Sequence, residues 1–317
     1  MGGRSDYDSE QRLIAPPNLG MRALLFASYV LYATSGSATL IVAMNTTDGL
    51  AVCADNRVRR QNVDTDGHHK IRVAKNGIVM TMSGSASVEA QNTSDGTFRP
   101  IYSFYDESID YLEQYKTADE VNWEELGAHL RTSFQNKVIR AIGGVPTWMK
   151  EFDAPGIKTI DELLFFYIGK DGKCYRIIAI VDYREAAGKG QIEAFVTPAM
   201  GVNVAPRSLI MTFGRADVFN RMYNKDDPAF TFAKKERVLR DLATYKGNSA
   251  GLGYLTDNVH AVEALRYIIY ITSNLGPNLV VSPTSDCGVF KTNGSFDLKM
   301  DLPPMTPAHL KFTSVRK

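Results

Sequence analysis

The stretch "ATLIVAMNTTDGLAVCADNRV", residues 38–58, decides the expected fold. Two runs rich in β-forming residues flank "TTDG", which is a hairpin signal and predicts paired strands at about 38–45 and 50–55. The stretch "HKIRVAKNGIVMTMSG" repeats this arrangement around "KNG" and predicts strands near 69–74 and 77–83. Two hairpins in succession predict a four-strand antiparallel unit near the start of the domain.

The remainder of the chain alternates between helical and β-rich segments. Apolar residues at three- and four-residue spacings predict helices, one of them capped by Asn122 with Glu125 three residues on. Further hairpins are expected around "KDG" at 170–172 and across "CGVFKTNGSFDLKM". This order predicts an α+β protein: a four-layer α/β/β/α sandwich, with two antiparallel sheets between helical layers. The expected helices lie near 104–115, 122–142, 215–223, 229–246 and 257–274.

Bulk composition excludes several classes of protein. The 317 residues are 44% hydrophobic and 22% charged, which is ordinary for a globular protein and unlike a disordered or polytopic membrane chain. A net charge of +1 offers no electrostatic case for a nucleic-acid or membrane partner. Among the 3 cysteines, Cys53 is expected to be a small buried hydrophobic residue. We expect no metal or cofactor, because adjacent His68 and His69 would point to opposite faces of a strand.

The N-terminal part of the chain has two sections. Residues 1–20 are polar and end in a Pro-Pro break, so we expect a disordered or non-native leader. Residues 21–36 combine Arg22, an apolar run over 23–33 and small residues, which is typical of a signal peptide or propeptide. The alternative is a buried helix or strand of the domain. Translation from Met21 would predict export, periplasmic or secreted; otherwise the protein is expected in the cytoplasm.

The domain is expected at 37–300, followed by a tail at 301–317. Its first part contains "SGSATLIVA", "DGLAVCADNR", "DGHHKI" and "GIVMTMSGSAS" in that order. Taken together over residues 36–88, these motifs resemble the first third of a proteasome β-type subunit. That family belongs to the N-terminal nucleophile (Ntn) hydrolases. The spacing is similar to the family's if about two extra residues are allowed in the first hairpin, at "NTTD".

The resemblance implies a nucleophile at Ser37, exposed when cleavage after Gly36 frees its amine. A serine hydroxyl needs a base within hydrogen-bond reach, and a free α-amine with a pKa of about 7.7–8.0 can serve. Lys70 matches the family's ammonium group that stabilises the alkoxide, and Asp55 matches the carboxylate that holds this lysine. The alternatives from the residues alone are an ordinary Asp55–Lys70 ion pair and an unprocessed Ser37 at a strand edge.

Further positions follow from the same resemblance. The peptide N–H of Gly84 is expected in the oxyanion hole, although this residue is otherwise a turn glycine, and Arg57 is expected to extend the ion network. Arg215 stands where active members of the family have a serine, and "PNLVVSPTSDCG" offers only Ser282 or Ser285 as supporting residues. The substrate-binding pocket is expected to be mainly apolar, and its residues are Val58, His68, Met82 and Ala86.

Two functions are consistent with these features. The first is a proteasome-like hydrolase that cleaves amide bonds in peptides or small amides and assembles as a homo-oligomer. The second is a catalytically inactive proteasome-like scaffold or binding protein. The altered support positions favour the second reading, whereas the joint placement of Ser37, Asp55 and Lys70 favours the first. No nucleic-acid partner and no stable membrane span are expected.

Overall fold

The computed structural model describes twelve stretches of the chain, and all structural statements refer to them. Ser37 and Arg215, the leader at 1–20 and most of the C-terminal tail lie outside these residues. The described stretches are 29–36, 39–60, 63–92, 98–140, 158–185, 192–203, 210–214, 217–222, 224–235, 257–275, 281–291 and 293–305.

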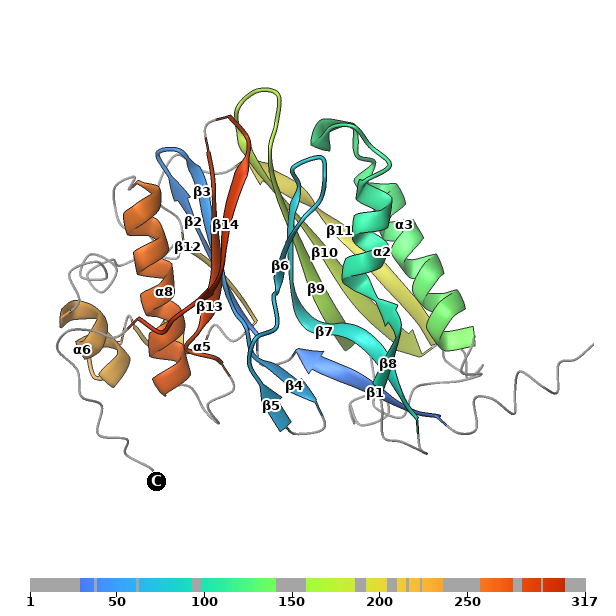
Figure 1. The fold of residues 1–317 in the computed structure, drawn as a ribbon, viewed down its shortest axis with the longest axis horizontal. Helices are drawn as coiled ribbons and strands as arrows, with labels where there is room; N and C mark the ends of the chain where they lie inside the picture. The colour runs from blue at the N-terminus through green and yellow to red at the C-terminus, as the bar shows by residue number, and fades with distance from the viewer. Residues whose placement is uncertain are drawn as a thin grey trace, which may run out of the picture.

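The strands form two antiparallel sheets (Figure 1). A five-stranded sheet has the order β12-β2-β3-β13-β14, and a nine-stranded sheet has the order β11-β10-β9-β7-β1-β4-β5 with β6 and β8 also paired to β7. The smaller sheet contains β2 (Leu40–Thr46), β3 (Gly49–Asp55), β12 (Ile210–Gly214), β13 (Ser285–Phe290) and β14 (Phe296–Leu302). The larger contains β1 (Tyr29–Gly36), β4 (Val58–Arg60), β5 (Val63–Thr65), β6 (Ile71–Val73), β7 (Val79–Asn92), β8 (Phe98–Ser103), β9 (Lys158–Ile168), β10 (Cys174–Glu185) and β11 (Ile192–Asn203).

Helices pack on both sheets. On the nine-stranded sheet lie α2 (Phe104–Leu112) and α3 (Trp123–Phe134), and on the five-stranded sheet lies α8 (Asn258–Leu275) with α5 (Asp217–Arg221) and α6 (Pro228–Lys235) beside it (Figure 1). A short 3-10 helix at Ala118–Glu120 precedes α3, and a π-helical segment at Gln135–Arg140 follows it. The predicted cap is present, because the Asn122 side chain accepts a hydrogen bond from the Glu125 N–H. Among the described residues, no helix is both long and apolar enough to cross a bilayer.

The first hairpin is confirmed. Strands β2 and β3 pair antiparallel in an unbroken register that runs from Ile41↔Ala54 to Thr46↔Gly49. The turn between them therefore contains only Thr47 and Asp48, and Gly49 adopts the positive φ of 138°. The hairpin is a regular one, and the two extra residues assumed in the sequence comparison have no structural counterpart.

The predicted four-layer α/β/β/α sandwich is wrong. The nine-stranded sheet is not one regular layer, because β7 changes partners along its fourteen residues. Residues 79–84 of β7 pair with β9, and its first three residues also pair with β6, whereas residues 84–92 pair with β1 and β8. The sheet therefore has two wings that share one long strand. Hydrophobic alternation could not reveal this exchange, since it reports which face is buried and not which strand is adjacent.

The segment expected to be a signal peptide or propeptide is partly within the fold. Residues 29–36 form β1, which lies between β7 and β4 in the larger sheet. Its register runs from Tyr29↔Asn92 to Gly36↔Gly84, and Ser35 also pairs with Arg59 of β4. The backbone of β1 thus continues the sheet on both sides, as the alternative reading of a strand allowed. Residues 21–28 lie outside the described residues.

Three clusters of buried side chains make up the core. One lies between α8 and the five-stranded sheet, and another between α2, α3 and the nine-stranded sheet. The third joins the inner faces of the two sheets, with Ile41, Val52 and Ala54 on one side and Val79 and Leu164 on the other. The third cluster therefore fixes the spatial relation of β3 to β7, and with it the geometry of the site described below.

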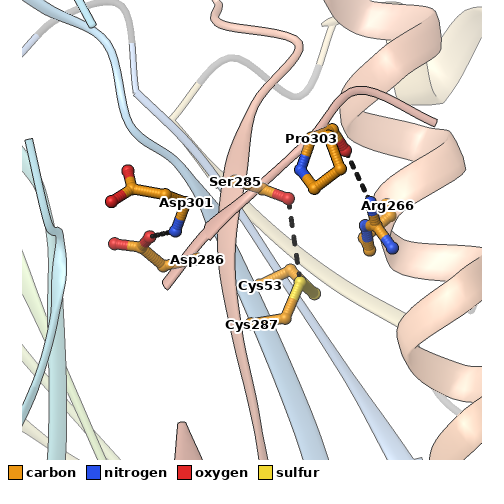
Figure 2. Close-up of a disulfide and its surroundings, with 7 residues drawn as sticks. All are labelled: Cys53, Arg266, Ser285, Asp286, Cys287, Asp301 and Pro303. Carbon is orange, nitrogen blue, oxygen red and sulfur yellow. Dashed lines mark hydrogen bonds between the residues drawn. A yellow bond between two sulfur atoms is a disulfide. The ribbon is translucent and has the colours of Figure 1, made fainter. Parts of the chain in front are cut away.

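A disulfide links β3 to β13 (Figure 2). It joins Cys53 to Cys287, which are 234 residues apart and directly opposite in the β3–β13 register. The expectation that Cys53 is a plain buried hydrophobe is therefore wrong, although the residue is fully buried. The third cysteine, Cys174, is a free thiol, and burial raises its pKa to about 12.

Candidate active site

Asp55 is the centre of the candidate site. It ends β3 and is fully buried, yet its carboxylate accepts four hydrogen bonds. Oδ1 accepts from the Leu40 N–H at 2.7 Å and from Lys70 Nζ at 3.0 Å, and Oδ2 accepts two further backbone N–H groups. A buried carboxylate is costly unless it is paired and hydrogen-bonded, and this one is both. The two backbone donors to Oδ2 are those of Arg57 at 3.1 Å and Ser282 at 3.2 Å.

Lys70 lies immediately before β6 and is almost fully buried, with 5% of its surface exposed. Burial lowers the pKa of its ammonium below the usual value, while the charge and hydrogen bond of Asp55 act in the opposite direction. The backbone at Lys70 is also fixed, because the Tyr105 hydroxyl donates to its carbonyl at 2.6 Å. The expected Asp55–Lys70 pair is thus present, and it is rigidly held.

A cavity of about 630 Å³ opens beside this pair. Lys70 and Gly84 line it, as do three of the four residues expected in the substrate-binding pocket: Val58, His68 and Met82. The backbone of Ala86 lies in β7, but its side chain is outside the described residues. The structure therefore brings together residues that are spread over nearly thirty positions of the sequence. Their roles remain proposals.

Thr39 was missed by the sequence analysis, and it lies at this cavity. It directly precedes β2, is 2% exposed, and lines the cavity together with Lys70 and Gly84. The hydrogen bond from the next residue, Leu40, to Asp55 holds this part of the chain against the ion pair. The missing signal was the hairpin register: a two-residue turn places Ala54 opposite Ile41, and hence Asp55 beside the start of β2.

The end of β12 also constrains Thr39. Gly214 has a φ of 74°, and a Cβ built on it would lie 2.0 Å from the Thr39 carbonyl oxygen and 2.6 Å from Ser83 Oγ. Only a glycine fits so close to another backbone. The position of Thr39 is therefore set from two sides, by Asp55 through Leu40 and by Gly214.

The other expected support residues have different outcomes. The Arg57 guanidinium forms an ion pair with the exposed Asp66, with Nε 2.8 Å from its carboxylate, and its charge also contributes to the lowered pKa of Lys70, so its role in the buried network stays a prediction. Ser282 reaches the site through its N–H, whereas the Ser285 hydroxyl faces the sulfur of Cys287 at 3.8 Å. Ser37 and Arg215 lie outside the described residues.

Comparisons with known proteins give little support from sequence. No family model matches the chain, and no curated protein matches it. Solved structures similar to it include Anbu (ancestral beta-subunit) from Yersinia bercovieri, with 13% identity, a TM-score of 0.42, and coverage of 81% of this chain and 82% of that one. Two others are Anbu from Hyphomicrobium sp. strain MC1 (11% identity, TM-score 0.40, coverage 83% and 87%) and its Gly-1 mutant (12%, 0.39, 83% and 88%).

The assignment to the proteasome β-type subunits is therefore withdrawn. The motifs over 36–88 are not accompanied by a match to any family model or curated protein. The likeness to ancestral beta-subunits, at 11% to 13% identity and TM-scores of 0.39 to 0.42, carries no argument about activity. None of these findings supports a signal peptide or secretion.

Proposed function

We propose that the protein is an amide-bond hydrolase whose nucleophile is a hydroxyl at the start of β2. The observation that carries this proposal is the buried Asp55–Lys70 pair, which is bonded to the Leu40 N–H and adjoins a cavity lined by Thr39. These contacts favour Thr39 over Ser37, which was expected from the sequence. Ser37 remains the rival position, and the same experiments distinguish the two.

The proposed chemistry needs a free amine at the nucleophile. Hydrolysis of the Ala38–Thr39 bond releases the preceding residues and leaves the Thr39 amine as a base with a pKa of about 7.7–8.0. The Thr39 hydroxyl attacks the substrate carbonyl carbon, and its proton passes through the amine to the leaving nitrogen. The amide bond breaks as an ester forms on Thr39, and water then hydrolyses that ester. Each group returns to its starting state.

Lys70 and Gly84 have supporting roles in this scheme. The Lys70 ammonium stabilises the negative charge that develops on the attacking oxygen, and Asp55 keeps that ammonium in place. The Gly84 N–H is proposed to donate to the oxyanion of the tetrahedral intermediate. Gly84 lines the cavity and has a φ of 133°, a conformation that side chains disfavour, so glycine is required there for backbone reasons as well.

The position of β1 supports an extended peptide as the substrate. In the intact chain β1 lies between β7 and β4, and its last residue, Gly36, is opposite Gly84. Removal of the residues before Thr39 would expose the edges of β7 and β4, and an extended peptide can pair with such edges. Val58, His68 and Met82 would then contact its side chains. Assembly into a homo-oligomer stays a prediction.

Activity of matched chains tests this function. A chain that begins at Thr39 should hydrolyse a fluorogenic peptide amide, and the intact chain should do so only after processing. Thr39→Ala should reduce the rate to background, and Lys70→Met should reduce it on the order of a hundredfold or more. Tyr115→Phe serves as a control. Tyr115 lies in the turn that follows α2 and does not line the cavity, so this variant should keep the parent rate.

The outcomes separate the candidate functions. Full activity in Thr39→Ala with loss in Ser37→Ala would move the nucleophile to Ser37. Absence of hydrolysis from every processed chain, with a folded protein, would reject the hydrolase and leave the non-catalytic scaffold or binding protein.

A further inference from the structure

A second cluster of reactive side chains lies next to the candidate active site. His69, Asp286 and Asp301 each offer one potential ligand atom, and these three atoms lie within 4.8 Å of one another. His69 Nδ1 is 3.1 Å from Asp286 Oδ2, and His69 Nε2 is 3.9 Å from Asp301 Oδ2. The three residues come from the loop before β6, from β13 and from β14, so the fold alone brings them together.

The two aspartates are oriented by the surrounding structure. In each carboxylate Oδ1 accepts a hydrogen bond while Oδ2 faces the imidazole: Asp286 Oδ1 accepts from the Asp301 N–H at 2.9 Å, and Asp301 Oδ1 accepts from Asn56 Nδ2 at 3.3 Å. Figure 2 shows the first of these bonds, with both carboxyl groups on the same side of the β13–β14 hairpin. Metal-ligating carboxylates are typically held by outer partners in this way.

The local charges also favour a cation. The Asp286 side chain is 1% exposed, and its negative charge is adjacent to that of Asp301. The nearby Lys70 ammonium interacts with the charge of Asp286 from a distance, but its ion pair is with Asp55. A protonated His69 would supply at most one positive charge against two carboxylates. A divalent ion would balance both.

We propose that His69, Asp286 and Asp301 bind a first-row divalent cation, with Zn²⁺ as the best fit. Zn²⁺ accepts both imidazole nitrogen and carboxylate oxygen as ligands, whereas Mg²⁺ and Ca²⁺ prefer oxygen ligands alone. Atoms that share a tetrahedral zinc lie about 3.4 Å apart, so ligand atoms that are up to 4.8 Å apart must move closer together when the ion binds. Asp301 is able to move, because its side chain is 63% exposed. His69 also lines the cavity, which leaves room for a water ligand.

The site is independent of the proposed hydrolase, and it differs from the sequence-based expectation of no metal. From the sequence, His68 was the only partner considered for His69, because the two residues are adjacent. The structure instead pairs His69 with two aspartates more than two hundred residues further along the chain. Such a ligand set has no local sequence signature.

Direct binding of Zn²⁺ to the full chain tests the proposal. The protein is prepared without a histidine tag, treated with a chelator, dialysed and titrated with ZnCl₂ in a calorimeter. We expect one Zn²⁺ per chain and a higher melting temperature in its presence. His69→Gln and Asp301→Asn should each weaken binding about a hundredfold or more, and Asn56→Ala should weaken it about 10- to 100-fold.

The chain offers a matched control in the exposed pair of His260 in α8 and Asp257 just before it, whose Nδ1–Oδ2 distance is 2.7 Å. This pair belongs to no such three-residue cluster among the described residues. His260→Gln should leave Zn²⁺ binding unchanged. The proposal is overturned if the parent chain binds no Zn²⁺, or if His69→Gln and Asp301→Asn bind it as tightly as His260→Gln does. Circular dichroism verifies that each variant is folded, and Asn56→Ala provides an independent readout if Asp301→Asn is not. Equal affinity for Mg²⁺ would also contradict the role of the imidazole.

Discussion

At the scale of single residues, Asp55 explains most of the site. Its four hydrogen bonds connect the starts of β2 and β6 with the residue after next, Arg57, and with the segment before β13. One carboxylate therefore holds together the segment that contains Thr39 and the segment that contains Lys70. A group of this kind can be replaced only at a cost, because Lys70 depends on its charge.

Asp55→Asn should therefore destabilise the fold strongly. The substitution leaves the Lys70 ammonium buried without a counter-charge, and loss of one partner of a buried pair costs about 3–5 kcal/mol. Asp66→Asn is the control, because Asp66 forms an exposed ion pair with Arg57 that contributes about 0–1 kcal/mol. Urea denaturation of both variants measures the difference. Equally small decreases in the free energy of unfolding of the two variants would show that Lys70 is not held as a buried ion.

The sequence identified some of these residues but not their arrangement. Asp55, Lys70 and Gly84 were expected from a resemblance; Lys70 and Gly84 line one cavity, Asp55 is bonded to Lys70, and their catalytic roles stay predictions. Thr39 was missed because two extra residues were assumed in a hairpin that has none. The Ser282 contact and the His69 cluster join residues more than two hundred positions apart, and no local propensity encodes such contacts.

At the scale of elements, the close approach of β12 to β2 positions Thr39, the proposed nucleophile. Gly214 ends β12 against the Thr39 carbonyl, in a left-handed conformation that only glycine adopts without strain. Adding a single methyl group at Gly214 therefore tests whether the position of Thr39 affects hydrolysis.

Gly214→Ala should displace Thr39 and abolish hydrolysis, since its Cβ would lie 2.0 Å from the Thr39 oxygen. Gly172→Ala is matched to it, because Gly172 has nearly the same φ of 73° and no atom within 4 Å of its built Cβ. That control carries only the conformational cost of about 1–2 kcal/mol and should keep its activity. Melting temperatures and rates are measured on both variants. Similar activity in the two would indicate that the close contact has no influence on the site.

Short-range sequence patterns predicted the individual turns and caps better than they predicted which strands pair with one another. The "TTDG" turn and the Asn122 cap were read correctly, because turn and cap residues act over a few positions. The two-winged sheet was not predicted, because the exchange of partners along β7 depends on strands that lie far apart in the sequence. Tertiary pairing determines that feature.

At the scale of the whole molecule, the Cys53–Cys287 disulfide ties the first hairpin of the domain to its last one. It encloses a loop of more than two hundred residues, and such a cross-link stabilises chiefly by restricting the unfolded chain. Because Cys53 lies two residues before Asp55, the same bond holds β3 and β13 together beside the candidate active site.

Thiol counting checks this connectivity. Native protein should show almost no thiol that reacts rapidly, because Cys174 is buried and its pKa is raised to about 12. Unfolding without reductant should expose one thiol per chain, and unfolding with reductant should expose three. Cys174→Ser should remove the single thiol of the non-reduced sample. Three reactive thiols without reductant would mean that the disulfide is absent.

Covalent labelling tests whether Thr39, held beside Lys70, is the nucleophile of an amide hydrolase. The processed protein is treated with a peptide β-lactone, and the intact chain and its fragments are measured by mass spectrometry. We expect one ester-linked adduct on Thr39 of a chain that begins at Thr39, and no adduct in Lys70→Met. A processed, folded chain that takes up no label, or that carries the label on any other residue, would contradict it.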